Sequence, residues 1–237
     1  MRLDKYVAQA LQLSRSEARS KILRGGIWVN GQVCKKADTN VTDKDEITSG
    51  GESLSQTQFV YLMLYKPEGV VSASNDKRQV TVVDLVKSHF PRRNLFPAGR
   101  LDKTSTGFVL LTDDGAFAHQ ILAPRRHVPK TYQVELDTPA TQQMVEAFEK
   151  GVTLADGQTM KPAQLVIQQD DPHQVEVVLH QGVYHQIKRM FGVLGAGVNR
   201  LHRTAIGPVE LDTGLQPGEW RALTPQEVEQ LRESCQM

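Results

Sequence analysis

The chain opens with apolar residues at helical spacing, a pattern that predicts two short helices followed by a hairpin. The apolar positions of the two helices are Leu3, Val7, Ala10 and Leu11, and then Ala18, Ile22 and Leu23. Ser14 offers an N-cap for the second helix, and Gly25 ends it. The strand-like run 27–29 then enters an Asn30-Gly31 pair, which is typical of a tight turn between strands. We therefore expect a small helix-helix-hairpin unit with a modest core of its own.

A polar segment separates this unit from the rest of the chain. Residues 49–58 are rich in Ser, Gly and Gln and show no periodicity, which predicts a flexible linker. We therefore expect three parts: a first domain over residues 1–48, a linker over 49–58 and a larger domain over 59–237.

The larger domain mixes strand-like and helix-like segments. The predicted strands are 59–65, 108–112, 131–136, 164–168 and 174–180. The predicted helices are 81–88, 115–122, 140–150, 184–194 and 225–233. Because these segments do not alternate strictly, as βαβ units would, we expect an α+β fold built on a largely antiparallel sheet flanked by helices.

The composition narrows the class of protein. No run approaches the roughly 18 apolar residues of a membrane span, and Met1 is not followed by an apolar signal core, so we expect a cytoplasmic protein. The two cysteines, Cys34 and Cys235, are far apart and form no CxxC pair, and the seven histidines are scattered. We therefore expect no disulfide framework, no metal site and no cofactor, in a protein that is a monomer.

Charge is distributed unevenly along the chain. The formal net charge is +1, yet residues 1–36 hold eight basic and two acidic residues, a local net charge of +6. Such a segment indicates contact with a polyanion, although a solvated helix face would look the same. The basic residues expected to make that contact are Arg2, Lys5, Arg15, Arg19, Lys21 and Arg24.

Three segments of the larger domain combine reactive side chains with turn residues. They are 98–107 (AGRLDKTSTG), 130–132 (KTY) and 182–191 (GVYHQIKRMF). Taken singly, Asp102 is typical of a turn, Tyr132 of strand packing and Lys188 of a solvated helix face. Together they supply a carboxylate, an aromatic ring and a cation, a minimal set for attacking the sugar of an extruded nucleotide. The sequence has no GxxxxGK loop, dinucleotide fingerprint or GxSxG elbow, which disfavours nucleotide hydrolysis, hydride transfer and esterase chemistry.

These segments resemble those of a known family. The run Gly99-Arg100-Leu101-Asp102 followed by Thr106-Gly107 resembles the signature loop of the pseudouridine synthases, in the branch typified by the ribosomal small subunit pseudouridine synthase A. Further segments similar to that branch are Lys130-Thr131-Tyr132, the run HQIKRMF over 185–191, and Leu201-His202-Arg203 with Ile206-Gly207. The first domain, from RLDKYVAQ to VNGQ, is similar to the S4 RNA-binding domain. The resemblance covers essentially the whole chain, in the same order.

The resemblance implies roles for individual residues. Asp102 corresponds to the catalytic aspartate, Tyr132 to the tyrosine that stacks on the flipped uracil, and Lys188 to the basic residue that pairs with the aspartate. Leu201 corresponds to the apolar residue that lines the uracil pocket. The further residues expected to bind the RNA substrate are Arg100, Leu101, Lys103 and Arg203, with Arg125 and Arg126 as additional phosphate contacts.

The implied reaction is an isomerisation of uridine to pseudouridine that consumes nothing. The bond from ribose to the base nitrogen breaks, the uracil turns while held, and a ring carbon bonds to the same sugar carbon. Asp102 would act in its ionised form, held charged by Lys188, either as nucleophile at the sugar or as base toward the neighbouring sugar position. The sequence leaves both routes open.

The expected substrate is 16S ribosomal RNA in a small-subunit assembly intermediate. One alternative is an enzyme of the same branch that acts on large-subunit RNA, and another is an S4-type RNA-binding factor without catalytic activity. Two features disfavour the large-subunit alternative. Some large-subunit relatives carry a basic tail, which this sequence lacks after residue 233, and one such relative lacks the S4-like domain, which is present here. A non-catalytic factor would have no reason to keep Asp102, Tyr132 and Lys188 together.

Overall fold

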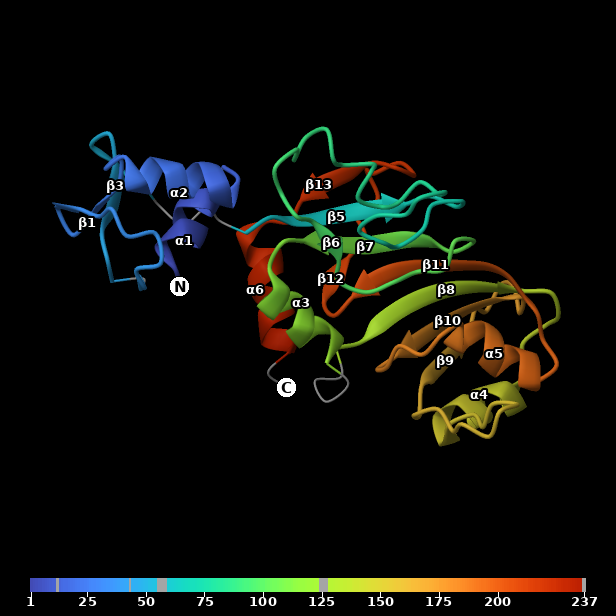
Figure 1. Cartoon of the computed structure of the whole chain (residues 1–237). Coiled ribbons are helices and arrows are strands. Elements are labelled where there is room, and N and C mark those ends of the chain that lie inside the picture. The colour runs from blue at the N-terminus through green and yellow to red at the C-terminus, as the bar shows by residue number, and fades with distance from the viewer. Residues whose placement is uncertain (12, 43, 55–58, 124–127, 236–237) are drawn as a thin grey trace. The chain divides into compact units, whose positions relative to one another are not determined.

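The chain forms two compact units, each with its own hydrophobic core (Figure 1). The computed structural model describes residues 1–11, 13–42, 44–54, 59–123 and 128–235. Unit 1 comprises Met1–Phe59 with Phe90–Asn94, and unit 2 comprises Val60–His89 with Leu95–Met237. Among the helices of the described residues, none has the length and apolar character that crossing a membrane requires.

Unit 1 contains the predicted helix-helix-hairpin arrangement. Helix α1 (Leu3–Ala10) and helix α2 (Arg15–Leu23) share a core with a four-stranded antiparallel sheet of order β2-β1-β3-β4. The predicted N-cap of α2 is confirmed, because Ser14 forms a capping box with Glu17. Strands β1 (Trp28–Val29) and β2 (Gln32–Val33) are joined by Asn30 and Gly31, which have φ angles of 51° and 77°. Positive φ at both central residues is the geometry of a tight hairpin turn, so that prediction is confirmed as well.

Part of the segment predicted to be a linker is instead ordered sheet. Strand β3 (Ile47–Ser49) and strand β4 (Glu52–Ser53) pair across a turn in which Gly50 and Gly51 have φ angles of 62° and 86°. Leu54 is buried, and its carbonyl accepts a hydrogen bond of 2.6 Å from the Tyr6 hydroxyl. A Gly-Gly pair is a hairpin signal as well as a linker signal, and here the hairpin prevails because the flanking residues pair. Residues 55–58 of the predicted linker lie outside the described residues.

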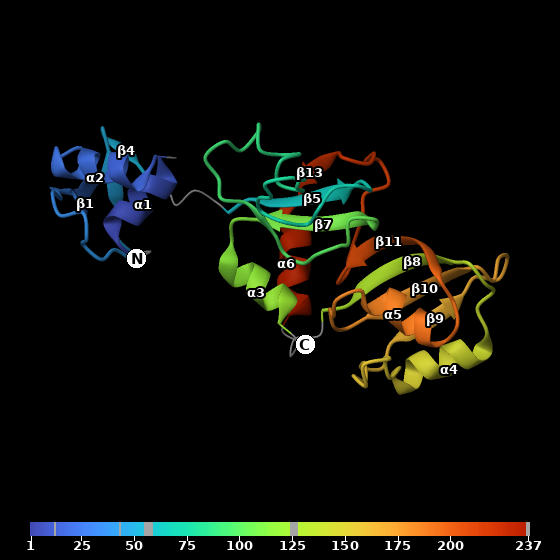
Figure 2. The same cartoon turned by 45° about the vertical axis from the view of Figure 1, so that its right-hand side comes forward.

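The core of unit 2 is a twisted mixed sheet whose long strands run side by side (Figure 2). Its strand order is β13-β5-β7-β11-β8-β10-β9, and within the described ranges every neighbouring pair is antiparallel except β7 with β11, which is parallel. The strands are β5 (Tyr61–Lys66), β7 (Thr106–Thr112), β8 (Lys130–Leu136), β9 (Gln164–Ile167), β10 (Gln174–Leu179), β11 (Val198–Ile206) and β13 (Trp220–Ala222). Short strand β6 (Phe96–Pro97) pairs with β7, and β12 (Val209–Glu210) pairs with β11. The predicted α+β fold with a largely antiparallel sheet is confirmed.

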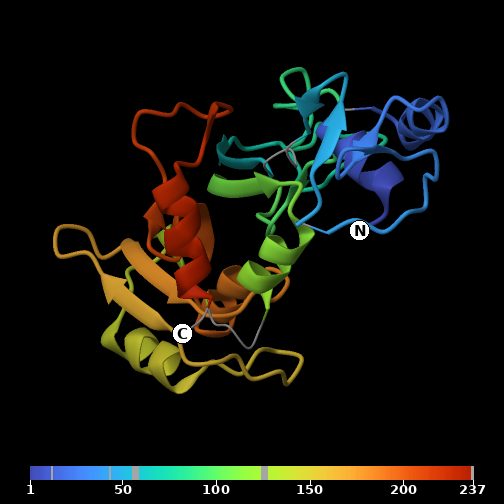
Figure 3. The same ribbon diagram turned by 90° about the vertical axis from the view of Figure 1, so that its left-hand side faces the viewer.

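Four helices of unit 2 cover the sheet. Helices α3 (Gly115–Leu122) and α6 (Pro225–Ser234) run alongside one another and share a core with Phe108 and Leu110 of β7 (Figure 3). Helix α4 (Gln142–Lys150) lies beside β9, and helix α5 (Gln186–Val193) contacts β11 (Figure 1). Phe148 of α4 and Phe191 of α5 are fully buried with their ring centroids 4.8 Å apart. The contact between these two rings therefore packs α4 against α5 on the part of the sheet that runs from β11 to β9.

The helix predicted at residues 81–88 is wrong, because this segment forms successive turns. Thr81 is fully buried, and its backbone N–H and hydroxyl both donate to the carboxylate of Asp84 at 2.9 and 2.8 Å. The N–H of Val82 donates to the carbonyl of Val71, a residue outside the segment. These bonds to the side chain and to a distant carbonyl replace the helical ladder, and the β-branched valines weaken helix formation further.

Candidate active site

Asp102 lies in the loop between β6 and β7, and this loop is held by hydrogen bonds from the segment after β5. The hydroxyl of Ser72 donates to the carbonyl of Leu101 at 2.9 Å and accepts from its N–H at 3.0 Å. The N–H of Gly69 donates to the carbonyl of Lys103 at 2.9 Å. The Asp102 side chain keeps 27% of its surface exposed. A carboxylate on so firmly held a loop is a preorganised reactive group.

Lys66, the last residue of β5, is fully buried beneath this loop. Its ammonium donates to three backbone carbonyls, those of Ser105 at 2.6 Å, Pro67 at 2.9 Å and Lys103 at 3.3 Å. Burial lowers the pKa of Lys66 to about 8, while the charge of Asp102 opposes that shift. Lys66 therefore places a cation near Asp102 and ties both sides of the loop to the sheet.

We expect Lys66 to make stability depend on pH in the alkaline range. In the folded protein its pKa is about 8, against an ordinary value near 10.5. Between these two values the unfolded chain binds more protons, so the Lys66 contribution to the free energy of unfolding rises with pH. Urea unfolding from pH 7 to 10.5 should show wild type gaining stability relative to Lys66→Met above pH 8. The comparison isolates Lys66 because Lys130, whose pKa burial also lowers to about 8, is present in both proteins. A difference that stays constant across this range would show that Lys66 titrates normally.

The imidazole of His185 lies beside Asp102. His185 is the N-cap of α5, and its Nε2 atom is 3.3 Å from Oδ1 of Asp102. Lys188, one turn further along α5, donates instead to the hydroxyl of Thr104 at 2.9 Å. The structure thus shows His185, and not the expected Lys188, beside Asp102. The left-handed backbone of His185 (φ 50°) places its ring at the carboxylate. Lys188 still contacts the Asp102 loop, two residues beyond the aspartate.

Tyr132 and Leu201 lie on neighbouring strands of the sheet. Tyr132 of β8 is opposite Arg203 of β11, and Leu201 of β11 is opposite Val134 of β8. Residues that are directly opposite in antiparallel strands present their side chains on the same face. Tyr132 and Leu201 are 9% and 8% exposed, so each has a small accessible surface. The two apolar side chains therefore share one face of the sheet.

The structure corrects the expectation for Arg203, which cannot reach RNA phosphates from the surface. It is only 2% exposed, and its Nε donates to the carbonyl of Phe108 at 2.7 Å. Its Nη2 atom is buried and has no hydrogen-bond partner within the residues that the structure describes. β11 runs directly beside β7 at this point, where Arg203 pairs with Gly107, and this packing buries the guanidinium. Arg203 is part of the scaffold under the loop.

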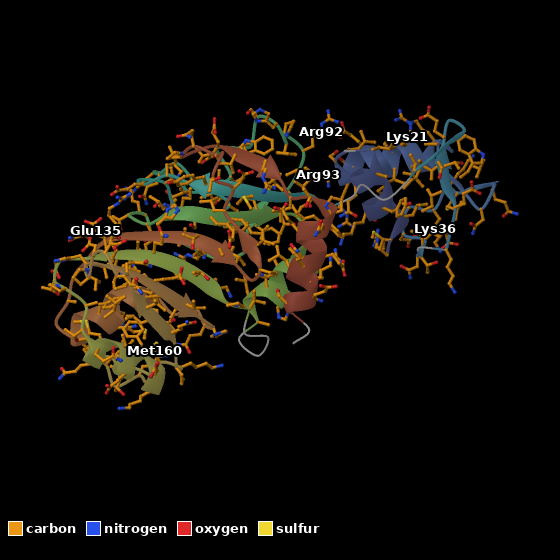
Figure 4. All side chains as sticks on the ribbon, turned by 180° about the vertical axis from the view of Figure 1, so that it is seen from behind. Lys21, Lys36, Arg92, Arg93, Glu135 and Met160 are labelled. Carbon is orange, nitrogen blue, oxygen red and sulfur yellow. The ribbon has the colours of Figure 1, made fainter. Side chains whose placement is uncertain are left out.

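The other predicted RNA-binding residues are mostly exposed. Arg100, Leu101 and Lys103 flank Asp102, and the first and last of these are exposed whereas Leu101 is buried. Arg125 and Arg126 lie outside the described residues. In unit 1, the exposed basic residues of the predicted set are Arg2, Lys5, Arg15, Arg19 and Arg24. Lys21, which is labelled in Figure 4, is half-buried.

Two of the unit 1 arginines share an acidic partner. Arg2 and Arg15 both contact the carboxylate of Asp4, at 2.8 and 3.2 Å. The side-chain hydrogen bond from Arg2 lowers the pKa of Asp4, while Arg2 and Arg15 keep 48% and 63% of their side chains exposed. Asp4 thus positions two guanidinium groups that remain accessible to a polyanion.

Sequence reasoning missed Lys66, Ser72 and His185. His185 stood within the HQIKRMF segment, which was itself a signal. No signal in the sequence marked Lys66 or Ser72, since a lysine after a strand and a serine in a loop are ordinarily exposed. Within the described residues, no three His, Cys, Asp or Glu side chains gather in a way that could hold a metal ion. The site thus offers the partly exposed carboxylate of Asp102, two lysines that contact its loop (Lys66 and Lys188), and the sheet face of Tyr132 and Leu201.

Comparisons with known proteins identify the family. The family model for RNA pseudouridylate synthase matches residues 60–192, and the model for the S4 domain matches residues 1–47. The chain is 42% identical over 236 residues to a protein of Bacillus subtilis that is named as an uncharacterized RNA pseudouridine synthase, YtzG (98% of this chain, 99% of that protein). It is 40% identical over 230 residues to the ribosomal small subunit pseudouridine synthase A of Escherichia coli K12 (96% and 98%). A crystal structure of a pseudouridylate synthase superimposes with a TM-score of 0.69 at 39% identity, over 98% of this chain and 99% of that one. The chain therefore belongs to the RNA pseudouridylate synthase family, and it is an S4-domain enzyme that converts uridine in RNA to pseudouridine.

Proposed function

We propose that this enzyme modifies a uridine in 16S, the small-subunit ribosomal RNA. The support is that proteins about 40% identical over nearly their whole length, from Vibrio vulnificus and Escherichia coli, are named ribosomal small subunit pseudouridine synthases A. The geometric observation that carries the chemistry is the carboxylate of Asp102, held on a hydrogen-bonded loop and left 27% exposed. A ribosomal substrate also agrees with the cytoplasmic location expected from the sequence.

In this proposal Asp102 acts on the ribose of the target nucleotide. The uridine leaves its stack and enters the site, at a cost of about a few kcal/mol that stacking and phosphate contacts offset. Asp102 then serves as nucleophile at the sugar or as base toward the neighbouring sugar position. In either route two groups lie near this carboxylate, the ring of His185 at 3.3 Å and the buried ammonium of Lys66.

The base is held by the apolar sheet face beside the loop. Tyr132 offers a ring on which uracil stacks while it turns, and Leu201 lines the same face. Lys188 braces the loop through Thr104 and contributes positive charge near the ribose. Arg100 and Lys103, exposed on either side of Asp102, bind the phosphates of the flanking nucleotides.

The exposed basic residues of unit 1 add affinity for the same RNA. Its exposed arginines and lysines bind the phosphate backbone, which steers association and makes it depend on salt. The S4 model that matches residues 1–47 agrees with this role. We propose that the RNA is met in an assembly intermediate of the small subunit, where the target segment is still accessible, and that the enzyme acts as a monomer.

The test is to map pseudouridine in ribosomal RNA from cells with and without the gene. We expect deletion to remove pseudouridine from one position of the small-subunit RNA and to leave the large-subunit RNA unchanged. The wild-type gene on a plasmid should restore that position, and the Asp102→Asn gene should not. If the lost pseudouridine lies in large-subunit RNA, the substrate assignment is wrong although the enzyme class stands.

A further inference from the structure

An aromatic side chain next to the active site takes no part in the proposed chemistry. Tyr184 is 71% exposed, which is unusual for so large a ring. Its ring stacks on the ring of His185, with centroids 3.9 Å apart and planes within 15° of parallel. Since His185 lies 3.3 Å from Asp102, the three side chains form a continuous line from the reactive carboxylate to solvent.

Hydrogen bonds hold the turn that carries Tyr184. The N–H of Val183 donates to the side-chain oxygen of Gln186, and the N–H of Gln186 donates to the carbonyl of Val183, both at 3.1 Å. Gln186 is only 4% exposed, and its amide nitrogen also contacts the sulfur of Met190 at 3.7 Å. His185 completes the turn in the left-handed conformation, with φ 50° and ψ 34°. A ring displayed on a fixed turn loses little conformational entropy when a ligand binds to it.

One face of the Tyr184 ring is covered by His185, and the high exposure leaves the other face open. Three basic side chains lie at the Asp102 loop: Lys188 contacts Thr104, and Arg100 and Lys103 are exposed. Arg189 donates to the carbonyl of Tyr184 at 3.5 Å and is paired with Asp156, and the acidic Glu68 is near Lys66. A ligand for this surface therefore combines a planar ring with negative charge. A nucleotide has both, since its base stacks on aromatic side chains and its phosphate binds cations.

We propose that Tyr184 is a stacking platform for an RNA base adjacent to the target uridine. The base lies on the open face of Tyr184, in the layer beyond His185, while the uridine occupies the space beside Asp102. Stacking there holds the neighbouring nucleotide outside the RNA structure and keeps the strand open at the target. The identity of the RNA rests on the proposed function above.

Binding measurements on inactive protein test the platform directly. Asp102→Asn serves as the background, and Kd is measured by filter binding to unmodified small-subunit and large-subunit rRNA transcripts. Tyr184→Ala should raise Kd for the substrate transcript by about 5- to 150-fold, the effect of losing one stacked base. Tyr184→Phe should restore Kd to within about twofold, because stacking needs the ring and not the hydroxyl. Tyr184→Leu, which is similar in size but not planar, should behave like the alanine variant.

A second arm locates the base. A set of short substrate RNAs is made, each with a single abasic nucleotide at a different position around the target. We expect one RNA of this set to bind the proteins with Tyr184 and with Tyr184→Ala equally well. Three outcomes would each overturn the proposal. They are an unchanged Kd for Tyr184→Ala, an equal rise in Kd for the alanine and phenylalanine variants, and a rise in Kd for Tyr184→Ala that no abasic position removes. In protein that keeps Asp102, a loss confined to kcat at saturating RNA would also overturn it, because it would mean that Tyr184 only orients His185.

The two proposals fail in different ways. Pseudouridine formed by the wild-type enzyme in large-subunit rather than small-subunit transcripts would contradict the substrate assignment. The Tyr184 comparison is then made on the large-subunit RNA, where the same outcomes decide it.

Discussion

Replacing Asp102 with asparagine should abolish pseudouridine formation while leaving RNA binding nearly unchanged. The substitution keeps the size of the side chain and removes only the negative charge, which the chemistry needs as nucleophile or base. We expect the single-turnover rate to fall by at least about a thousandfold, in the range that follows removal of an acid–base group or nucleophile. Tritium release from RNA labelled at carbon 5 of uridine measures the rate, and filter binding measures the affinity.

Glu149→Gln is the matched control, since it also removes one carboxylate charge from unit 2. Glu149 is exposed on α4, and its amide variant should keep full activity. Lys188→Met should lower the rate less than Asp102→Asn does, because Lys188 reaches the loop only through Thr104. An Asp102→Asn protein with activity within about tenfold of wild type would refute the catalytic role of this residue, since such a change is too small for the loss of a reacting group.

Replacing Gly107 with alanine should strongly destabilise unit 2. Gly107 has φ 106°, and a Cβ atom there would lie 2.6 Å from the backbone nitrogen of Arg203 and nearer still to its carbonyl oxygen. Both partners are main chain in the parallel β7–β11 pair, so neither can turn away. Strain from the positive φ and from the forced separation of the strands should together cost about 3–5 kcal/mol. Urea unfolding measures this loss as a lower midpoint.

Gly192→Ala provides the control for glycine replacement itself. Gly192 is inside α5, and within the described residues no atom other than its chain neighbours and the backbone of its own helix lies within 4 Å of the position that a Cβ would take. Alanine favours a helix over glycine by about 1 kcal/mol, so this variant should be as stable as wild type or more so. If Gly107→Ala lost less than about 1 kcal/mol, strands β7 and β11 could not approach as closely as the structure shows, because overpacking at main chain costs more than that.

The sequence predicted those features that neighbouring residues determine. The Ser14 cap with Glu17 and the Asn30-Gly31 turn follow from hydrogen bonds and φ angles within a few residues, and both were confirmed. Most of the predicted strands and helices of unit 2 were also found, because their apolar periodicity matches the face that each one buries. The failure at 81–88 had a local cause, the bonds from Thr81 to Asp84, and a non-local one, the bond from Val82 to Val71.

Motif order identified the family and led to the prediction of Asp102 as the catalytic residue, whereas the surroundings of Asp102 depended on tertiary structure. Lys66 is the last residue of β5, and His185 precedes α5, so both are far from Asp102 along the chain. A lysine at the end of a strand looks the same in a sequence whether it is solvated or buried against three carbonyls. Arg203 illustrates this as well, since the resemblance suggested a phosphate contact and the approach of β11 to β7 buried it. The sequence thus predicts which residue types can carry chemistry. Which of them contact one another is decided where strands distant in the chain meet, because burial and hydrogen-bond partners are properties of the packed sheet.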